Sequence, residues 1–438
     1  MGHELGTGET VVDESGTHFV LAQLIGEGGQ GKVFATTAEG VAVKIIAGGE
    51  SRGRRSVHEE RIGRVARMPV ADLPVAAPRF VLVGDAVGYT MTLLTGMTSL
   101  SELCRMMGEP FDQSWYVGGG GLLKRLSVVE SLAELIGTLH GRGLIYCDFS
   151  TNNVLVSASP DRARVFLIDL DNLRNVADPP SGRIFTPPFA APENQTGFPS
   201  QASDAFAFAA LAFSVLTATN PFYGALLDGM APDRLDETPF SALAPWIDDP
   251  NDSRNRWPHA VPRELTVSPR LRNLFELTFT AGLSSPSLRT PASAFAIAAR
   301  RARYAVRRCP ECCWDNYVGR TNCASCGEVL AGFQLRLYVE GASQVVPFDL
   351  CPVVVVNRRE VTEVSAAALG FFEKTTVPGL RVRCTGDRWS VELIHDALTF
   401  GQNVASKAKD LGAREPLRLF RRNRLALQIR LEQIGDST

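Results

Sequence analysis

The stretch from Gly143 to Leu173 constrains the fold of this 438-residue chain more than any other. It contains two short runs of β-branched and aliphatic residues, Val154–Val156 and Val165–Ile168. The segment between them is polar and holds Ser, Pro, Asp and Arg, the residue types of turns. This pattern predicts a hairpin of two short buried strands.

Three polar residues, Asp148, Asn153 and Asp169, would lie at the ends of these strands. Asp169 follows four apolar residues, so its carboxylate is expected at the edge of a hydrophobic core. A bare carboxylate there is costly unless a cation or a hydrogen-bond donor meets it. Taken singly, each residue also fits a capped hairpin with a surface aspartate.

Taken together, these residues resemble the catalytic loop and the metal-binding segment of the protein kinases. Tyr146-Cys147-Asp148 stands where that family has His-Arg-Asp, Asn153 follows Asp148 by five residues, and Asp169-Leu170-Asp171 stands for Asp-Phe-Gly. The resemblance implies that Asp148 accepts the proton of a substrate hydroxyl. It also implies that Asn153 and Asp169 hold Mg²⁺ on the phosphates of ATP.

A glycine-rich turn, Gly26–Gly31, lies between two predicted strands, Phe19–Ile25 and Lys32–Ala35. The G-x-G-x-x-G spacing alone is a weak signal, and in a Rossmann fingerprint a helix would follow it. Here a second strand follows, and then a third, Val41–Ile46, which carries Lys44 among apolar residues. This order resembles the kinase N-lobe, in which the lysine meets ATP phosphates. The alternative for Lys44 is an edge lysine whose ammonium extends into solvent.

The residues after this strand are predicted to form a helix over Ser51–Arg67 and a hairpin of Phe80–Val83 with Tyr89–Leu94. The resemblance implies that Glu59, or alternatively Glu60, pairs with Lys44. It also places Met91 behind the adenine and the hinge at 92–94. The nucleotide-binding residues implied are Gly26, Gly28, Gly31, Val33, Ala42, Lys44, Met91, Leu93 and Leu155.

Motifs downstream of the hairpin resemble those of kinases that act on proteins. The run from Thr186 to Glu193 resembles the end of the activation segment, and Asp204 opens an apolar helix as the residue that would brace the catalytic loop. Arg289 would pair with Glu193. Small-molecule kinases lack the Ala-Pro-Glu segment, and Thr186 favours a Ser or Thr acceptor. A long helix is predicted at 122–140, after a flexible glycine insertion at 118–121.

Three departures from the kinase pattern affect the expected regulation. Cys147 replaces the arginine that reads a phosphate on the activation loop, so loop phosphorylation is not expected to be the switch. Ser150 replaces a lysine that usually contacts the γ-phosphate, and Asp171 replaces a flexible glycine. All five groups that handle ATP remain, which favours catalysis over a pseudokinase scaffold.

Four cysteines, Cys309, Cys312, Cys323 and Cys326, form two C-x-x-C pairs. This spacing predicts a structural Zn²⁺ site with no open coordination position, and Gly327 suits the turn after the last ligand. Arg307, Arg308 and Arg320 nearby permit contact with nucleic acid, but a solvated basic face is the preferred interpretation.

The last part of the chain reads as all-β, with expected strands at 335–339, 353–356, 380–384, 389–393 and 425–431. A closing hairpin is expected at 417–431 and a loop or short helix at 401–411. The pattern is weakly similar to a forkhead-associated sandwich, but it has no clear Gly-Arg and Ser-x-x-His pair for phosphothreonine. A β-domain that is structural or binds a protein partner is therefore predicted.

These patterns predict an α+β chain: a bilobal protein-kinase fold, a zinc ribbon and an all-β, sandwich-like domain. The expected boundaries are 17–304 for the kinase (lobes 17–94 and 95–304), 305–330 for the ribbon and 331–438 for the β-domain. A net charge of -2 argues mildly against a nucleic-acid partner. With no apolar signal core at the start, a cytoplasmic enzyme with a protein substrate is expected. A pseudokinase scaffold and a nucleic-acid-associated regulator are the alternatives.

Overall fold

The computed structural model describes residues 5–28, 31–46, 52–104, 108–158, 163–178, 184–338, 350–357, 361–370, 377–386, 388–400, 407–411, 416–421 and 424–434. Gly29 and Gln30 of the glycine turn, and residues 401–406 of the expected loop, lie outside these ranges. Contacts divide the chain into two compact units. The first holds residues 1–111, 131–260 and 273–293, and the second holds residues 112–130, 261–272 and 294–438.

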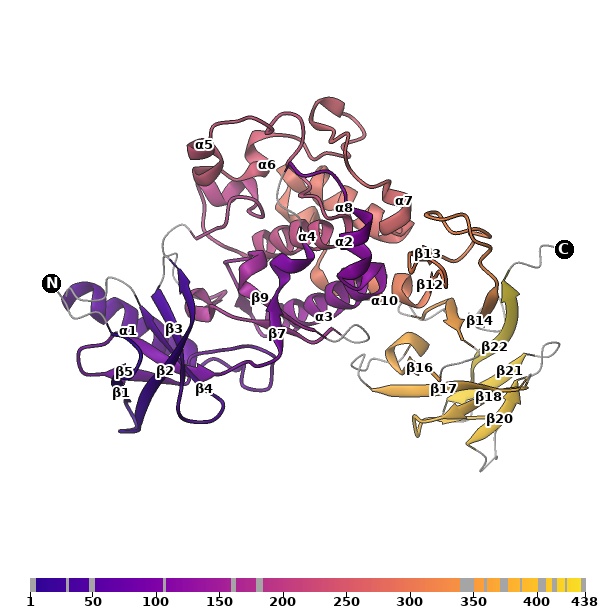
Figure 1. Ribbon diagram of the computed structural model, residues 1–438, viewed down its shortest axis with the longest axis horizontal. Coiled ribbons are helices and arrows are strands. Elements are labelled where there is room, and N and C mark those ends of the chain that lie inside the picture. The colour runs from indigo at the N-terminus through magenta and orange to yellow at the C-terminus, as the bar shows by residue number, and fades with distance from the viewer. Residues whose placement is uncertain are drawn as a thin grey trace. The chain divides into compact units, whose positions relative to one another are not determined.

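Within the first unit, six strands close a barrel in the order β1-β2-β3-β4-β6-β5 (Figure 1). They are β1 (Thr10–Asp13), β2 (His18–Gly28), β3 (Gly31–Thr36), β4 (Val41–Ile46), β5 (Phe80–Val83) and β6 (Gly88–Thr92). The predicted strands and the predicted 80–94 hairpin are confirmed by these elements. One apolar cluster includes Phe19, Leu21 and Phe34, and a second includes Ala42, Tyr89 and Met91.

The hairpin predicted from 154–168 is confirmed as strands β9 (Val154–Ser157) and β10 (Val165–Leu167), which pair antiparallel. Strand β7 (Met97–Ser99) adds to the outer edge of β9. Strand β8 (Leu144–Ile145) precedes the catalytic loop and pairs with β11 (Arg174–Asn175). Three short 3-10 helices lie along this part of the chain: η1 (Leu100–Leu103), η2 (Thr151–Asn153) and η3 (Leu170–Asn172).

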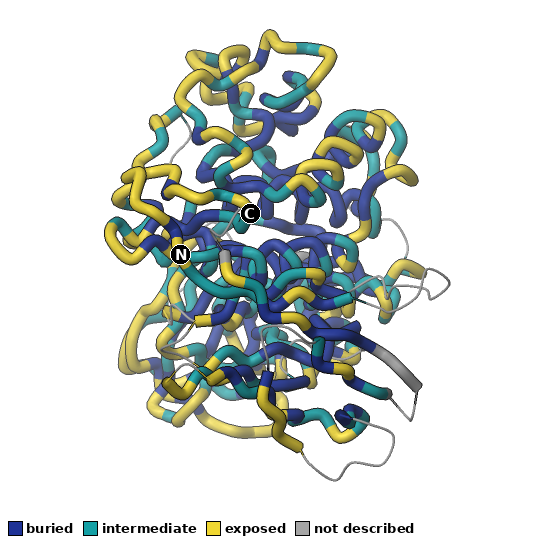
Figure 2. The backbone as a smooth tube through the Cα atoms, turned by 90° about the vertical axis from the view of Figure 1, so that its right-hand side faces the viewer, coloured by how far each residue is buried: buried dark blue, intermediate teal, exposed yellow. Residues whose placement is uncertain are grey.

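The central helix α4 (Gln201–Thr217) is buried over almost its whole length. Ser200 and Ser203 form a capping box at its start, in which each side chain bonds the backbone N–H of the other. Phe206 and Phe213 pack against Phe279 with ring centroids 5.5 and 6.2 Å apart. This apolar packing fixes α4, and therefore the polar residues at its first turn. Figure 2 shows buried residues along the strands and inner helices and exposed residues on the connecting loops.

The remaining helices have the following bounds. They are α1 (Arg52–Ala66), α2 (Gln113–Gly118), α3 (Gly121–Gly141), η4 (Pro192–Gln195), α5 (Pro232–Glu237), α6 (Phe240–Leu243), η5 (Ser253–Asn255), α7 (Arg263–Thr266), α8 (Pro269–Phe279), α9 (Ala281–Ser284), η6 (Pro286–Leu288), α10 (Ala292–Tyr304) and η7 (Ala367–Leu369). The long helices predicted at 51–67 and 122–140 are confirmed by α1 and α3. In the predicted glycine insertion at 118–121, Gly118 ends α2 and Gly121 begins α3, with positive φ at Gly120 and Gly121. Among the residues described, no helix is both long and apolar enough to cross a membrane.

The second unit contains a small two-stranded ribbon, β12 (Val306–Arg308) with β13 (Asp315–Tyr317). Two further antiparallel sheets follow, in the orders β15-β14-β22-β21-β19 and β16-β17-β18-β20. Their strands are β14 (Gly332–Tyr338), β15 (Val353–Val356), β16 (Thr362–Ser365), β17 (Pro378–Thr385), β18 (Arg388–Leu393), β19 (Leu398–Thr399), β20 (Ala408–Leu411), β21 (Leu417–Arg421) and β22 (Arg424–Ile434). Residues of both sheets share one apolar core, which includes Leu335, Val382, Trp389 and Ile429.

The architecture confirms the expected α+β class and the all-β character of the C-terminal part. The closing hairpin at 417–431 is confirmed by the pairing of β21 with β22. The loop or short helix expected at 401–411 is wrong for residues 408–411, which form β20 against the edge of β18. Three of these four residues are exposed, so the segment lacks the alternating apolar pattern by which a strand is recognised.

Candidate functional site

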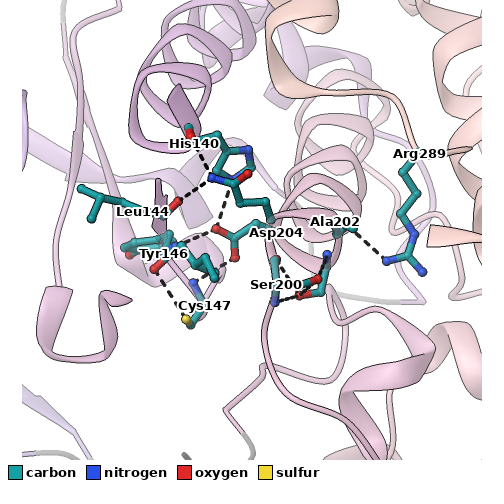
Figure 3. Close-up of polar contacts among 11 residues, drawn as sticks. His140, Leu144, Tyr146, Cys147, Ser200, Ala202, Asp204 and Arg289 are labelled. Carbon is teal, nitrogen blue, oxygen red and sulfur yellow. Dashed lines mark hydrogen bonds and ion pairs between the residues drawn. The ribbon is translucent and has the colours of Figure 1, made fainter. Parts of the chain in front are cut away.

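The loop that precedes Asp148 is held by the first turn of α4, whose Asp204 points toward Tyr146 and Cys147 (Figure 3). The carboxylate of Asp204 accepts hydrogen bonds from the backbone N–H groups of Tyr146 at 2.6 Å and Cys147 at 2.9 Å. His140 Nε2 lies 3.2 Å from the same carboxylate. Cys147 has a φ of 75°, a costly conformation for a non-glycine residue, and the two bonds to its peptide region hold it there. The predicted bracing contact is therefore present in the structure.

Asp148, which follows this braced turn, is largely buried, and its backbone carbonyl accepts a hydrogen bond from Asn153 Nδ2 at 3.0 Å. That bond engages the amide nitrogen of Asn153, so the amide oxygen is the atom left for a cation. Ser150 caps η2, with its Oγ accepting from the Asn153 N–H at 3.2 Å. The serine that replaces the expected lysine thus orders the loop. Thr186 Oγ1 donates to Asp148 Oδ1 at 2.8 Å.

Asp169 lies close to Asn153 because backbone hydrogen bonds fix Ile168, the residue that joins it to β10. The N–H of Ile168 donates to the carbonyl of Asn153 at 3.0 Å, and Tyr146 OH donates to the carbonyl of Ile168 at 2.7 Å. Asp169 itself has left-handed backbone angles, with φ 57° and ψ 52°, which turn the chain into η3. The two strands thus bring Asp148, Asn153 and Asp169 together, as the order of the motifs predicts.

Lys44 on β4 contacts two carboxylates of this segment. Its Nζ forms ion pairs with Asp169 Oδ1 and, at 2.9 Å, with Asp171 Oδ2. The second oxygen of Asp171 accepts a hydrogen bond from the hydroxyl of Tyr89, which is fully buried. Lys44 and Tyr89 are cross-strand neighbours on β4 and β6, and the ammonium lies 5.9 Å from the ring centroid. The site therefore contains a buried cluster of one ammonium, two carboxylates and one phenol.

Burial and charge act in opposite directions in this cluster. Burial raises the pKa of Asp169, Lys44 opposes that rise, and the neighbouring charges of Asp171 and Asp148 add to it, so that the pKa stays above its usual value. Burial would lower the pKa of Lys44, but Asp171 and Asp169 outweigh it and raise that pKa. Two carboxylates therefore share one ammonium, which is more negative charge than it balances.

This donor set fits Mg²⁺. Carboxylate oxygens and an amide oxygen are ligands that Mg²⁺ takes in phosphate-handling sites. Because Asp169 and Asp171 share a single ammonium, a further cation here would offset the remaining negative charge. Asn153 and Asp169 are the residues that would hold the ion.

The helix α1 approaches this cluster with a different residue from the one predicted. Among the described residues, the carboxylates in ion-pair distance of Lys44 are those of Asp169 and Asp171. Glu59 is half-buried and Glu60 is exposed on α1, and their pairing with Lys44 stays a prediction. The contact that α1 makes with η3 is a hydrogen bond from Arg61 Nη1 to Asn172 Oδ1 at 3.2 Å.

The predicted nucleotide-binding residues lie on neighbouring strands of the barrel. Gly26 and Gly28 are on β2, Gly31 and Val33 on β3, and Ala42 lies opposite Met91 across β4 and β6. A Cβ at Gly31 would lie 2.0 Å from the carbonyl oxygen of Ile45, so no larger residue fits there without a shift of the backbone. Leu155 is on β9, where it pairs with Ser99.

One hinge amide is already engaged. The N–H of Leu93 donates to the carbonyl of Gly40 at 2.9 Å, which extends the pairing of β4 with β6 by one residue. Within the predicted hinge 92–94, the Leu93 amide is therefore engaged in the sheet and is not the one to face a base.

Glu193 and Arg289 form the ion pair that the sequence predicts. The guanidinium of Arg289 binds both carboxylate oxygens of Glu193, at 2.5 and 2.8 Å. It also donates to the carbonyls of Ala202 and Gly282 and lies over the ring of Phe206 at 4.9 Å. The pair ties η4 and the segment after η6 to the start of α4, which is the helix that braces the catalytic loop.

The four ribbon cysteines form a separate cluster in the second unit. Their sulfur atoms all lie within 4.8 Å of one another, with Cys309 and Cys326 at 3.6 Å and Cys312 and Cys323 at 3.5 Å. A tetrahedral Zn²⁺ site with Zn–S bonds of about 2.3 Å has sulfur–sulfur edges of about 3.8 Å. The thiols are therefore close to the geometry that zinc requires. Gly327 has a φ of 79°, as the turn after Cys326 demands.

The ribbon is fastened to α2 and to the start of α3. Asp315 Oδ2 accepts a hydrogen bond from the N–H of Leu123 at 2.9 Å, and Asp315 Oδ1 pairs with Arg308 Nε at 3.0 Å. Trp314 packs on Tyr116 with ring centroids 5.6 Å apart. A Cβ on Gly121 would lie 2.4 Å from Asp315, so glycine permits this close approach. Further along the chain, Glu130 on α3 pairs with two arginines of α10, Arg300 at 3.0 Å and Arg303 at 2.8 Å.

The sequence patterns do not identify two residues of the Lys44 cluster, Asp171 and Tyr89, as site residues. Asp171 does carry a signal, because an aspartate two residues after Asp169 adds a second carboxylate to a segment that already needs a cation. Tyr89 alternates with Met91 on β6, but its cross-strand position opposite Lys44 depends on the strand register.

Comparisons with known proteins agree with these motifs. The chain is 26% identical over 237 residues to the serine/threonine-protein kinase PknD of Chlamydia abortus, a match covering 47% of this chain and 24% of that protein. It is 24% identical over 220 residues to the serine/threonine-protein kinase pkn2 of Myxococcus xanthus, covering 48% of this chain and 25% of that protein. It thus spans about a quarter of the length of the curated relatives it matches. No protein-family model matches.

Among solved structures, the PknI kinase domain of Mycobacterium tuberculosis aligns with 68% of this chain and 98% of its own length, at 17% identity and a TM-score of 0.41. That likeness is too low to carry an argument. The N-terminal part of this chain is distantly similar in sequence to bacterial Ser/Thr protein kinases.

Proposed function

We propose that this chain transfers the γ-phosphate of ATP to a Ser or Thr hydroxyl of a protein. The observation that carries the proposal is the support around Asp148. On the N-terminal side of Asp148, the Asp204 carboxylate accepts a hydrogen bond from the Cys147 N–H. On the C-terminal side, the Asn153 side-chain amide donates to the backbone carbonyl of Asp148. The backbone that carries the Asp148 carboxylate is thus held on both sides, and phosphoryl transfer depends chiefly on positioning and charge neutralisation.

Asp148 would orient the acceptor hydroxyl and accept its proton. Its Oδ1 already accepts a hydrogen bond from one hydroxyl, that of Thr186 at 2.8 Å. A Ser or Thr of a substrate would present the same chemical group to the second carboxylate oxygen. Thr186 therefore supports a hydroxyl acceptor, and we place it at the substrate side of the site.

The remaining groups would bind and orient the nucleotide. Lys44 would contact the phosphates, and the glycines on β2 and β3 would let backbone N–H groups approach them. Asn153 and Asp169 would hold Mg²⁺, which when bound would offset negative charge on the phosphates. We also propose that the Leu94 amide, rather than that of Leu93, meets the adenine.

The departures at Cys147 and Ser150 support a kinase without a phosphate-operated activation loop. The Cys147 side chain is buried, and its thiol donates to the carbonyl of Ile145 at 3.5 Å. It offers no cation that could bind a phosphorylated residue. Ser150 is engaged in capping η2. We therefore propose that another input controls activity.

We propose that the four cysteines hold a structural Zn²⁺ ion and that the β-domain binds a protein partner. The zinc proposal is supported by four thiols in near-tetrahedral reach of one another. The β-domain proposal is supported by its own apolar core, which indicates a module with a surface of its own. A forkhead-associated identity is not proposed.

The test measures phosphate transfer from Mg²⁺-ATP to the protein itself (autophosphorylation) and to a generic Ser/Thr protein substrate. We expect Asp148→Asn to lower the rate by about 100- to 10,000-fold, because it removes the proton acceptor while keeping the side-chain shape. Asp85→Asn, the same chemical change in the exposed turn between β5 and β6, serves as the matched control. Unfolding temperatures should be alike in all three proteins.

An Asp148→Asn protein with the wild-type rate would overturn the proposal. A wild type whose unfolding temperature rises with ATP, but which transfers nothing, would favour the pseudokinase scaffold instead. A wild type that neither binds ATP nor transfers phosphate would leave the C-terminal modules as the functional part.

A further inference from the structure

We infer that Asp171, fixed by Tyr89, is the residue that positions Lys44, in place of a glutamate on α1. The inference rests on the proposed nucleotide-binding role of Lys44. It assigns a task to a side chain at a position where the kinase pattern has glycine and therefore no side chain at all.

The first step of the argument is burial. Asp171 is 1% exposed and Lys44 is 6% exposed. Opposite charges enclosed in this way interact through a low effective dielectric, and each would be costly to bury without the other. Lys44 Nζ lies 2.9 Å from Asp171 Oδ2, within the range of a charge-assisted hydrogen bond.

The second step is the fixed position of the Asp171 carboxylate. Its other oxygen accepts the hydrogen bond from Tyr89, a residue that is itself fully buried in the barrel core. Tyr89 and Lys44 lie opposite each other across β6 and β4. One carboxylate therefore bridges two neighbouring strands and sets the direction of the lysine.

The third step distinguishes the role of Asp171 from that of Asp169. If Asp169 binds Mg²⁺, its carboxylate is drawn to the metal and its hold on Lys44 weakens. Asp171 has no such second task, because its oxygens are engaged by Lys44 and Tyr89. It can keep Lys44 in place while the ammonium contacts a phosphate.

The fourth step concerns α1. The contact described between this helix and η3 joins Arg61 to Asn172, two positions that are not part of the Lys44 ion pairs. The lysine is anchored by the segment that carries Asp169 and by the barrel. Its orientation is therefore expected to persist when α1 moves, and α1 would not act as an activity switch through Lys44.

The experiment compares Asp171→Asn, Tyr89→Phe and Glu59→Gln in the full-length protein, with Asp85→Asn as the surface control. Steady-state kinetics should show kcat/KM for Mg²⁺-ATP lowered about 10- to 100-fold by Asp171→Asn, because a hydrogen bond to a charged group is lost. Tyr89→Phe should give a several-fold loss, since the anchor is loosened and not removed. Glu59→Gln should give the smallest loss of the three.

A second readout does not depend on activity. Lys44 is labelled with an amine-directed acylating reagent at about pH 9 without nucleotide, and the extent is measured by mass spectrometry. Losing the Asp171 carboxylate should increase labelling several-fold, because the ammonium is then released from a buried ion pair and becomes more accessible to the reagent. Labelling of exposed lysines should not change.

The outcomes separate the two proposals. Increased labelling in Asp171→Asn and Tyr89→Phe, in a protein without phosphotransfer, supports the anchor and overturns only the kinase activity. Increased labelling in Glu59→Gln with no change in Asp171→Asn overturns the anchor and restores the helix glutamate. If Asp171→Asn fails to fold, Tyr89→Phe decides, because it removes one oxygen and leaves the ring that packs the core; unchanged labelling in that variant overturns the inference.

Discussion

The two polar clusters of this chain are held together in opposite ways. Lys44 meets its carboxylates across 125 and 127 residues of sequence, and the strands and α4 bring them into contact. The four cysteines lie within 18 residues, and around them the ribbon has only two three-residue strands and a few turns. The first cluster combines opposite charges that attract one another. The second contains like groups that, once deprotonated, would repel one another without a metal.

This contrast between the two clusters indicates in which of them one side chain can take the place of another. In the lysine cluster, the fold supplies the geometry, so a carboxylate from η3 can occupy the place predicted for a helix glutamate. In the ribbon, the ligands themselves supply most of the geometry, so each cysteine is needed. The following predictions test this contrast, beginning with the largest expected effect.

Removing the metal should unfold the ribbon but leave the lysine cluster intact. Structural zinc contributes about 10–16 kcal/mol to small metal-dependent folds, far more than the contacts of so short a ribbon can replace. Metal analysis should find one equivalent of zinc in the wild type and none in Cys312→Ser/Cys323→Ser. Amide hydrogen exchange over 306–330 should then become fast, while β4 and β6 stay protected.

Cys104→Ser/Cys384→Ser, two substitutions at half-buried thiols outside the cluster, is the matched control and should retain the zinc. A metal-free ribbon with protected amides would show that its packing on α2 and α3 suffices, and the contrast between the clusters would fail.

Breaking the Glu193–Arg289 pair should destabilise the first unit by about 3 kcal/mol. Glu193→Gln leaves the guanidinium of Arg289, whose side chain is 1% exposed, without its charged partner. Because Arg289 also contacts Ala202, faster amide exchange should spread to the start of α4. The measurement is exchange at 201–206 compared with 408–411 in the β-domain.

The exposed Glu264→Gln change on α7 removes a charge elsewhere and controls for net charge. If exchange at 201–206 matches that of the wild type, the pair contributes to geometry but not to the stability of the helix that braces the catalytic loop.

Losing Asp315 should have the smallest effect, about 1–2 kcal/mol, and it should be local. Asp315→Ala removes the acceptor for the Leu123 N–H in the first turn of α3, which acts as a helix cap supplied by another segment. Exchange of the amides at 121–124 should accelerate, whereas zinc content should stay at one equivalent. Glu328→Gln, an exposed carboxylate in the same ribbon, is the control.

Loss of zinc from Asp315→Ala would contradict this prediction. It would mean that docking on α3, and not the metal, folds the ribbon, which would make the second cluster resemble the first in depending on distant contacts.

Much of the fold could be predicted because many elements carry strong local signals. Strand β4 has the predicted bounds, Val41–Ile46, because five of its six residues are apolar. Helix α4 follows from a long apolar run with a capping box before it. Strand β20 could not be predicted, since Ala408, Lys409 and Asp410 are exposed and only pairing with β18 makes them a strand. Short motifs with fixed spacing were enough to predict Asp148, Asn153, Asp169 and the four cysteines as site residues.

The sequence by itself determined which chemical groups this protein has: the ordered kinase motifs, the bracing Asp204, the Glu193–Arg289 pair and the ribbon ligands. Only the tertiary structure decided which carboxylates meet Lys44. Residue spacing fixes contacts within a loop or a turn, because few backbone conformations join neighbouring residues. A contact across more than 120 residues depends on strand register and on how η3 turns after Asp169, and these are set by the packing of the whole unit.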